Sequence, residues 1–399
     1  MNVLFLSLTF PDRTSPERGT YNLGLCAALA QTHRVHAIVP RGWHECLGAG
    51  VRKAYEPSAE TQAAGVSVDF PIYWYLPRVM PQSRGAALWH SIRPRVASLS
   101  KTFRPDVVLS YWAYPDGDAG RRAAKHFGVP SVVIVGGSDV LLMPKEPGNE
   151  RVIREVLQQS SCVATVSDGL RRAAIGLGVP ADAVRTIRQG IDPHVFQPGD
   201  RAAARRRLAM SDDEEALVWV GRMVPVKNLD MLVTAVAAAA HDRPHLKLHL
   251  IGDGQCRAPL EARIAAEGLQ KLVRFEGPAP HDRLPDWYRS ANLTVLSSHS
   301  EGLPNVLRES LACGTPYVSV DVGDISEISG PGGTLVPAGN PVAFARAIIE
   351  ALGDAATRPT PTSRARTWLE CAEDFTVLFE DLRRDRSLER SKLDVSSCS

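Results

Sequence analysis

The sequence predicts an α/β protein with two open parallel sheets in tandem, each covered by helices. Short apolar segments alternate with longer amphipathic stretches, as expected for strands and helices that follow one another along the chain. They repeat about every 25–30 residues, the length of a β–α unit. The chain has 399 residues, which is enough for two domains of ordinary size.

The candidate strands fall into two sets, separated by a turn-rich segment at residues 189–200. Each is a short apolar run typical of a buried strand. The first set comprises residues 3–6, 35–39, 66–70, 107–110, 132–135, 162–166 and 184–187. The second set comprises residues 217–220, 246–251, 273–275, 293–296 and 317–320.

The stretches between these strands predict helices. Helices are expected over residues 21–30, 117–127, 228–240, 281–290 and 304–312, and after the glycines at 252–254. Residues 84–102 predict a helix that is broken at Pro94, and residues 41–64 read as irregular. Residues 368–382 carry apolar side chains at helical spacing and predict one more amphipathic helix.

These elements predict a division of the chain into domains. Residues 1–195 form the first domain and residues 196–365 the second. Residues 366–385 form the C-terminal helix, and residues 386–399 a disordered tail. For two open parallel sheets in tandem, the ligand site is expected in the crevice between them, beyond the carboxyl ends of the strands.

The composition excludes several classes of protein. Hydrophobic residues make up 44%, which argues against disorder as the main state, and no apolar run reaches the ~18 residues of a membrane span. The N-terminus lacks a basic leader and reads as a strand rather than a signal peptide. The net charge of +2 does not favour nucleic acid as a partner. Seven widely spaced cysteines without a C-x-x-C motif predict reduced thiols in the cytoplasm.

Positive charge is concentrated in the first half of the sequence. Residues 1–195 carry 22 Lys and Arg against 16 Asp and Glu, whereas the remainder is net negative. The segment 88–104 places Arg93, Arg95, Lys101 and Arg104 among apolar residues. Two interpretations stay open: contact with an anionic membrane surface at the inner face of the cell membrane, or a core helix with a solvated basic face.

The most informative segment is EGLPNVLRESLACGTP at residues 301–316. Glu301 lies in the loop after a predicted strand, and Glu309 lies more than one turn into the next helix. Both carboxylates can face the same edge of the sheet, where the helix N-terminus directs its free N–H groups. Carboxylates placed there can accept hydrogen bonds from sugar hydroxyls. The alternative is a pair of solvated glutamates.

This segment resembles the E-x7-E signature of the family 4 glycosyltransferases, which have the GT-B fold. Other segments resemble the same family in the expected order, and together they cover about residues 185–330. They are residues 189–192, 218–222, 227–228, 250–254, 275–277 and 318–328. The resemblance implies two Rossmann-like, doubly wound domains that face each other across a cleft, with the C-terminal helix crossing back onto the first.

The resemblance also implies an activity. It is a retaining, metal-independent transfer of a sugar from a nucleotide diphosphate-sugar to an acceptor hydroxyl, with no cofactor. Arg222 and Lys227 would neutralise the diphosphate leaving group, and Glu301 would contact the donor sugar. Glu309 would hold the ribose. The other expected donor contacts are Gly19, Gly302, Leu303 and Asn305.

The first domain resembles the family more weakly. Gly19 lies where the family has a glycine-rich loop against the diphosphate, although it also fits an ordinary turn. Residues 111–117 and 136–139 look like a bacterial subgroup that builds exopolysaccharide or teichuronic-type polymers, so Trp112, Asp116 and Asp139 are expected to bind the acceptor. In the second of these motifs, many relatives have a histidine before the glycine, and this chain has Gly136-Gly137 there. Asp139 is expected either to accept a proton or hydrogen bond from the substrate hydroxyl or to cap a helix.

The expected partners are a nucleotide-sugar and a glycan or lipid-linked acceptor. Two other functions stay open. The chain would be a nucleotide-sugar epimerase if products form without an acceptor. It would be a sugar-nucleotide or polymer-binding protein if nucleotide binds but nothing turns over. The sequence does not specify the sugar, the base or the acceptor.

Overall fold

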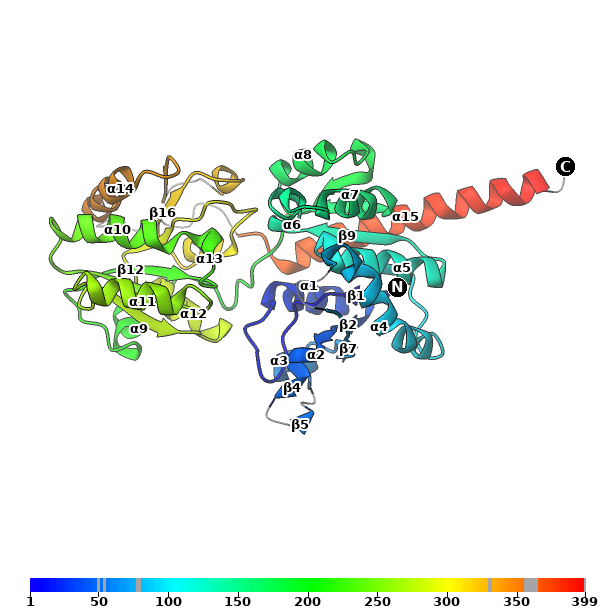
Figure 1. Ribbon diagram of the computed structural model, residues 1–399, viewed down its shortest axis with the longest axis horizontal. Helices are drawn as coiled ribbons and strands as arrows, with labels where there is room; N and C mark the ends of the chain where they lie inside the picture. The colour runs from blue at the N-terminus through cyan, green and yellow to red at the C-terminus, as the bar shows by residue number, and fades with distance from the viewer. Residues whose placement is uncertain (49–50, 53–54, 77–79, 329–331, 355–364, 398–399) are drawn as a thin grey trace. The chain divides into compact units, whose positions relative to one another are not determined.

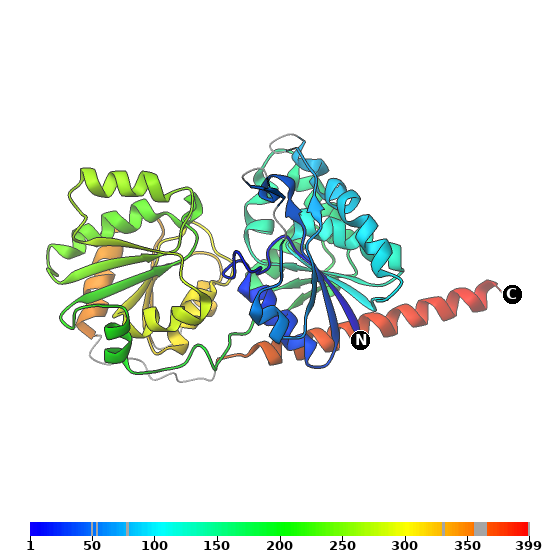
Figure 2. The same ribbon diagram turned by 90° about the horizontal axis from the view of Figure 1, so that it is seen from below.

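The computed structural model describes residues 1–48, 51–52, 55–76, 80–328, 332–354 and 365–397. The chain divides into two compact units: unit 1 comprises Met1–Gly190 and Arg366–Ser399, and unit 2 comprises Ile191–Ala365. Each unit contains an open parallel sheet with helices on both of its faces (Figure 1, Figure 2). The predicted α/β class with two parallel sheets is confirmed. The predicted boundary at residue 195 lies slightly beyond the one between the units.

Unit 1 is built on a seven-stranded parallel sheet with the order β11-β10-β9-β8-β1-β2-β6. The central strands are buried on both faces, which explains their continuous apolar runs. The strands are β1 (Asn2–Leu6), β2 (Arg34–Ile38), β6 (Ser67–Asp69), β8 (Val107–Tyr111), β9 (Ser131–Val135), β10 (Cys162–Thr165) and β11 (Val184–Thr186).

Residues 41–64, predicted as irregular, contain several short elements. Strand β3 (Arg41–Gly42) pairs with β7 (Ile72–Tyr73), and β4 (Leu47–Gly48) pairs with β5 (Val51–Arg52). Helices α2 (Trp43–Cys46) and α3 (Ala59–Ala63) lie between them in sequence. These elements are too short to show a periodic pattern, which is why the sequence did not reveal them.

The longer helices of unit 1 cover the sheet. They are α1 (Thr20–Ala30), α4 (Arg84–Leu99), α5 (Asp118–Phe127), α7 (Asn149–Gln159) and α8 (Asp168–Gly176). The four-residue helix α6 (Ser138–Leu141) follows β9. The predicted break at Pro94 is wrong, because α4 continues through it. Pro94 is exposed, so the backbone hydrogen bond that it removes lies on the solvent side, where water can bond the carbonyl. Leu88, Ile92 and Val96 are fully buried on the other side and hold the helix to the core.

The C-terminal helix α15 (Trp368–Ser397) returns to unit 1 and packs on α1. The contact is close because Gly24 of α1 leaves room for the Trp368 indole; a Cβ on Gly24 would lie 2.6 Å from the indole Nε1. The sequence predicted disorder from residue 386, whereas α15 continues to Ser397 and extends past the body of the unit (Figure 2). Cys398 and Ser399 lie outside the described residues.

Unit 2 is built on a six-stranded parallel sheet with the order β14-β13-β12-β15-β16-β17. Its strands are β12 (Glu215–Val220), β13 (Leu246–Ile251), β14 (Val273–Gly277), β15 (Leu293–Leu296), β16 (Tyr317–Val320) and β17 (Gly333–Val336). Its helices are α9 (Arg201–Arg207), α10 (Leu229–Ala240), α11 (Arg257–Ala266), α12 (Leu284–Ser290), α13 (Asn305–Ala312) and α14 (Pro341–Asp354). The sequence did not predict β17, an edge strand that begins with glycine, or α9 and α14.

Two further features bear on the predicted location and chemistry. Six cysteines are described, and none of these six forms a disulfide bond: Cys26, Cys46, Cys162, Cys256, Cys313 and Cys371. Among the described helices, none combines the length and the apolar content that crossing a bilayer requires.

Candidate active site

Lys227 and Glu301, predicted from separate motifs, form an ion pair at the carboxyl edge of the unit 2 sheet. Lys227 Nζ lies 2.6 Å from Glu301 Oε1, and the hydroxyl of Ser298 donates a second hydrogen bond of 2.5 Å to the same oxygen. The Lys227 side chain is 22% exposed and that of Glu301 11% exposed. Because the pair is only partly in contact with water, its charges interact more strongly than those of a surface pair.

Backbone contacts between two loops bring this pair together. One loop follows β12 and carries Lys227, and the other follows β15 and carries Glu301. The Ser297 hydroxyl donates to the carbonyl of Lys227 at 2.9 Å, and His299 N donates to the carbonyl of Val226 at 2.8 Å. These contacts fix the two loops to each other at the strand ends, where open α/β sheets bind ligands.

Glycines allow the neighbouring loops to approach closely. A Cβ on Gly252, after β13, would lie 1.9 Å from the carbonyl oxygen of Gly221. A Cβ on Gly323, after β16, would lie 2.0 Å from the carbonyl oxygen of Glu301. Both glycines have positive φ, which other residues rarely adopt. The loops after β12, β13, β15 and β16 therefore form one packed edge around the ion pair.

Arg222 lies in the loop after β12, as Lys227 does, and differs from it in its contacts. Its side chain is exposed, and among the described residues it makes no hydrogen bond or ion pair. A guanidinium with open donors can bind an incoming anion without first losing a protein partner.

Glu309 is held in place by aromatic side chains that the sequence did not single out. It is 8% exposed, and the Tyr288 hydroxyl donates to its Oε2 at 2.9 Å. His281 Nε2 lies 3.7 Å from the other carboxylate oxygen. Burial and the neighbouring carboxylate raise the pKa of Tyr288 well above its ordinary value, so the phenol stays a hydrogen-bond donor. The ring of Phe196 lies against both His281 and Tyr288.

The segment between the two glutamates places backbone groups at the same edge. Gly302 is buried and Leu303 half-buried, and helix α13 begins at Asn305. No side chain caps the N-terminus of α13, and the Asn305 amide oxygen accepts from Arg308 at 3.1 Å. The N-terminus of α13 lies directly after the loop that carries Glu301, at the edge where the sequence predicts donor contacts.

In unit 1, Gly19 lies where the sequence places it, at the start of α1. It has a left-handed conformation with φ 73°, and a Cβ there would lie 2.6 Å from the carbonyl oxygen of Thr9. Asn22 Nδ2 donates to that same carbonyl at 2.6 Å. The loop between β1 and α1 is therefore folded tightly on itself, and glycine is required at position 19 by the backbone alone.

A buried ion pair holds the other side of this loop. The guanidinium of Arg41 is completely buried and lies 2.7 Å from Asp12 Oδ2. It also donates to the carbonyls of Leu8 and Phe10, at 3.1 and 2.7 Å. Neither Arg41 nor Asp12 stands out in the sequence, because Arg41 is one of many arginines in a segment without a periodic pattern.

Asp139, predicted either to contact the substrate hydroxyl or to cap a helix, does not occupy the N-cap of α6. It is fully buried, and its carboxylate accepts from the backbone N–H groups of Ala113, Gly136 and Gly137, at 3.1, 3.2 and 2.9 Å. Gly137 holds the N-cap position of α6. These hydrogen bonds tie the loop after β8 to the loop after β9.

Asp116 has a similar role. It is 3% exposed, and its Oδ1 accepts from the N–H of Leu8 at 2.5 Å, which ties the β8 loop to the β1 loop. Trp112, in the same loop, is half-buried and has a left-handed φ of 85°. The three predicted acceptor residues thus share one edge of the unit 1 sheet, where only Trp112 is accessible.

The pH dependence of stability tests the burial of Asp116. Burial raises its pKa to about 7. Between about pH 4 and pH 7 the folded chain keeps a proton that the unfolded chain releases, so this group lowers stability as pH rises through that window. The shift corresponds to at most about 4 kcal/mol.

We expect Asp116→Asn, which stays neutral, to flatten the fall in the free energy of unfolding between pH 4 and pH 8, measured by urea titration. Burial also raises the pKa of Asp139, so a slope of the same sign should remain. Asp182→Asn, at an exposed position of the same unit, should leave the slope unchanged. An Asp116→Asn protein with the wild-type slope would show that Asp116 is ionised in the folded chain.

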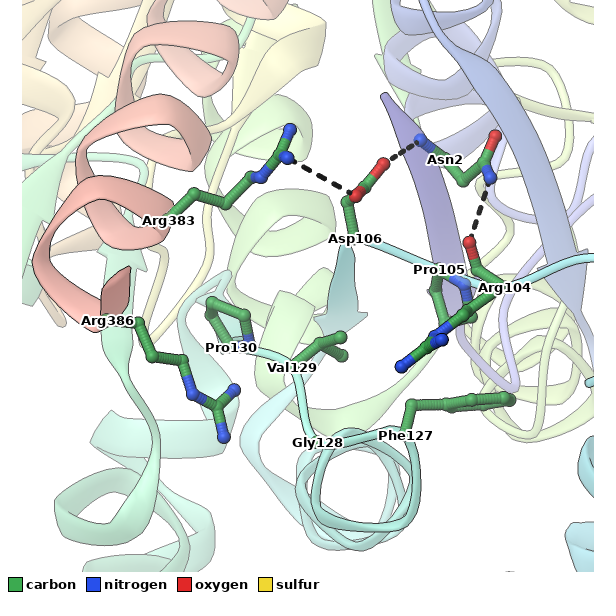
Figure 3. Close-up of a pocket in the computed structure, with 10 residues that line it drawn as sticks. All are labelled: Asn2, Arg104, Pro105, Asp106, Phe127, Gly128, Val129, Pro130, Arg383 and Arg386. Atoms are coloured by element: carbon green, nitrogen blue, oxygen red, sulfur yellow. Dashed lines mark hydrogen bonds and ion pairs between the residues drawn. The ribbon is translucent and has the colours of Figure 1, made fainter. Parts of the chain in front are cut away.

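A separate pocket of about 510 Å³ lies in unit 1 at the amino ends of β1, β8 and β9 (Figure 3). Asp106 there accepts from the N–H of Asn2 at 2.8 Å and lies 3.7 Å from Arg383 of α15. None of the predicted site residues lines it. We place the candidate site at the carboxyl edges, because ligands of open α/β sheets bind there and because the sequence motifs meet there. Within the described part of the chain, no group of three or more His, Cys, Asp and Glu is placed to hold a metal ion.

Two family models match the chain, one in each unit. The model described as Glycosyltransferase Family 4 matches residues 19–195, and the model described as Glycosyl transferases group 1 matches residues 214–354. The first match contains Gly19, Asp116 and Asp139, and the second contains the Lys227–Glu301 pair.

Named relatives agree with these models. A D-inositol 3-phosphate glycosyltransferase of Thermobispora bispora is 35% identical over 283 residues, which cover 65% of each chain. The chain thus spans less than two thirds of that relative's length. A putative teichuronic acid biosynthesis glycosyltransferase, TuaC, of Bacillus subtilis is 27% identical over 340 residues, which cover 83% of each chain.

Solved structures match almost the whole chain. A sucrose-phosphate synthase from Thermosynechococcus elongatus superposes with a TM-score of 0.73 at 20% identity, over 99% of this chain and 100% of that one. Anabaena Alr3699/HepE in complex with UDP-glucose gives 0.70 at 18% identity, over 98% and 100%. At such identities the likeness shows the fold. Together with the two family models, it shows that the chain belongs to the family 4 glycosyltransferases and has the GT-B fold.

Proposed function

We propose that this chain transfers a sugar from a nucleotide diphosphate-sugar to an acceptor hydroxyl, with retention of the anomeric configuration. The observation that carries the proposal is the Lys227–Glu301 pair at a sheet edge, where the loop that carries Lys227 also carries the exposed Arg222. Two cations at a strand edge can neutralise a diphosphate leaving group, so a divalent metal is not needed for that step.

The reaction balances without a dedicated protein base. The bond between the anomeric carbon and the diphosphate oxygen breaks, and the acceptor oxygen bonds to the same face of that carbon. The acceptor proton passes to the departing diphosphate, whose negative charge Arg222 and Lys227 stabilise. The Glu301 carboxylate stabilises positive charge at the anomeric carbon. This route agrees with the burial of Asp139, which has no exposed surface in the structure.

The relatives support one donor and one class of acceptor. The structural neighbour from Anabaena is described in complex with UDP-glucose, which makes UDP the first nucleotide to test. The Bacillus subtilis relative is named for teichuronic acid synthesis, which supports a polysaccharide or lipid-linked acceptor in cell-surface glycan synthesis. Exposed Arg93, Lys101 and Arg104 support contact with the anionic inner face of the cell membrane.

Thermal unfolding with UDP, GDP, ADP and CMP tests the donor site. A ligand at a hundred times its dissociation constant adds about 2.7 kcal/mol of stability, so one nucleoside diphosphate should raise the midpoint by several degrees. We expect Arg222→Ala to lose most of that shift. Arg346→Ala, which removes an exposed arginine from α14, should keep it.

Product analysis then separates the other functions. A sugar transferred only when an acceptor is present supports the proposal. A converted nucleotide-sugar without acceptor would identify an epimerase. Stabilisation by a nucleotide with no turnover on any acceptor would identify a binding protein. If none of the four nucleotides shifts the midpoint at millimolar concentration, the donor site proposed at this edge is wrong.

A further inference from the structure

Four aromatic side chains of unit 1 lie together beside the loop that carries Gly19. They are Trp43, His44, Trp74 and Tyr75, and we call them the aromatic wall. The rings of Trp43 and Trp74 are nearly parallel, with centroids 6.4 Å apart and an interplanar angle of 7°. His44 meets Tyr75 edge-on at 5.7 Å. Trp74 is 59% exposed, which is unusual for the largest apolar side chain.

Hydrogen bonds hold the Trp43 ring and the backbone at Trp74 in place. Trp43 Nε1 donates to the carbonyl of Tyr75 at 2.7 Å, which joins the segment after β3 to the segment after β7. Trp74 N donates to the hydroxyl of Ser91 on α4 at 3.0 Å. A ring that is already held, as the Trp43 indole is, loses little conformational entropy when a ligand packs beside it.

The wall lies at the ligand-binding edge of the unit 1 sheet. Strand β3 follows the carboxyl end of β2, and β7 follows the carboxyl end of β6. The wall is also joined to the loop before α1, because Glu45 of α2 lies 2.7 Å from Arg18, the neighbour of Gly19. The structure therefore places flat apolar faces next to a half-exposed charged pair.

This combination suits the chemistry of a pyranose. Such a ring has a face of axial C–H bonds that packs on an aromatic plane, and equatorial hydroxyls that need donors and acceptors at its rim. The indole faces supply the aromatic plane for the C–H bonds. The guanidinium of Arg18 and the carboxylate of Glu45 supply the donors and acceptors for the hydroxyls. Burial opposes ionisation of Glu45, but Arg18 outweighs it and holds the pKa of Glu45 below its ordinary value, so it is a charged acceptor.

We propose that the aromatic wall, with Arg18 and Glu45, is a subsite for a sugar ring of the acceptor. The inference rests on the proposed function, because it assigns the part of the acceptor site that unit 1 supplies. A lipid surface is the competing occupant, since Leu76 and Met80 nearby are 69% and 67% exposed. The charged Arg18–Glu45 pair favours the sugar, because a bilayer interior would have to desolvate both groups.

Saturation-transfer NMR on the full chain tests this subsite. The probes are the methyl glycosides of glucose, galactose, mannose and N-acetylglucosamine, each at about 20 mM to detect weak binding. We expect at least one probe to receive saturation at its axial protons. Trp74→Ala should weaken that binding about tenfold or more, and Trp74→Phe should restore most of it. Leu369→Ala, which removes an exposed apolar side chain of α15, is the matched control and should bind as wild type does.

Three outcomes would overturn the proposal. They are no saturation of any probe with the wild-type chain, unchanged binding by Trp74→Ala, or a Trp74→Ala protein that loses only its binding to phosphatidylglycerol vesicles. The shift of the midpoint by UDP, measured on the same preparations, reports on the donor site and not on the aromatic wall. A wild-type chain that binds a glycoside through Trp74 but shows no UDP shift would contradict the proposed function and leave the sugar subsite standing.

Discussion

Replacing Lys227 with methionine should lower the affinity for UDP about a hundredfold, which corresponds to about 2.8 kcal/mol. The methionine keeps the length and apolar stem of lysine and removes the charge. Lys227 lies at a partly buried sheet edge, where a charged hydrogen bond to a phosphate is stronger than in water. Titration calorimetry on the two proteins gives the affinities directly.

Removing the charge of Glu301, the partner of Lys227, should have the opposite effect on the affinity for UDP. In the structure the ammonium of Lys227 is held by Glu301 at 2.6 Å, so a diphosphate has to compete with that carboxylate. Glu301→Gln removes both the competition and the repulsion between two anions. We expect it to bind UDP about three- to tenfold more tightly. We expect the same variant to transfer sugar about 10²–10³-fold more slowly, since charge at the anomeric carbon loses its stabilising carboxylate.

Lys227→Met and Glu301→Gln are expected to change the affinity for UDP in opposite directions, so measuring both tests the roles of the two residues. Lys271→Met removes an exposed lysine near the amino end of β14 and should leave UDP affinity unchanged. If Glu301→Gln weakens UDP binding as Lys227→Met does, then Glu301 positions Lys227 instead of competing with the ligand. If Lys227→Met binds UDP as wild type does, Lys227 does not contact the phosphates.

Replacing Arg41 with methionine should destabilise unit 1 by about 3–5 kcal/mol. The Arg41 side chain has no exposed surface, and its partner Asp12 is 1% exposed, so the variant leaves a buried carboxylate without its cation. The variant also leaves the carbonyls of Leu8 and Phe10 without their buried donor. For a unit of this size we expect the thermal midpoint to fall by roughly 10 °C.

A matched variant at an exposed arginine, and the pH dependence of the stability loss, test whether the buried pair is the cause. Arg13→Met breaks the exposed pair of Arg13 with Glu56, whose side chains are 75% and 57% exposed, and should not change the midpoint measurably. In wild type, burial opposes ionisation of Asp12, but hydrogen bonds from Thr14 and the charge of Arg41 outweigh it and lower the pKa. Without Arg41 the carboxyl takes up a proton more readily, so the loss of stability should shrink between pH 7 and pH 4. A loss that is the same at both pH values would show that Asp12 is not the cause.

The sequence predicted most strands of both sheets, because buried parallel strands are continuous apolar runs. Residues 246–251, 293–296 and 317–320 were predicted to the residue. The errors lie where a local pattern carries little information. Pro94 read as a helix break, since its exposure on α4 depends on packing, and the short strand β17 starts with glycine and has no long apolar run.

The candidate site was also predicted only where a local sequence pattern was present. Lys227, Glu301 and Glu309 were predicted because their motifs resemble those of the family. The hydroxyls of Ser298, beside Glu301, and of Tyr288, beside Glu309, were not predicted. The polar run Ser297–Ser300 after β15 could have indicated a functional loop, whereas no local signal connects Tyr288 with Glu309. No local pattern indicated that Asp139 is completely buried, because its burial depends on how the loops after β8 and β9 pack.

The sequence by itself determined the two parallel sheets and the family to which the chain belongs. The periodicity of apolar residues and the spacing of charged residues after strands are local properties, so they can be recognised in the sequence without knowledge of the fold. Only the tertiary structure decided that Lys227 is paired with Glu301, that Arg41 is buried and that Trp43 lies parallel to Trp74. The physical reason is that burial and pairing depend on which loops meet at a sheet edge. That meeting is set by strand order, which joins segments far apart in the sequence.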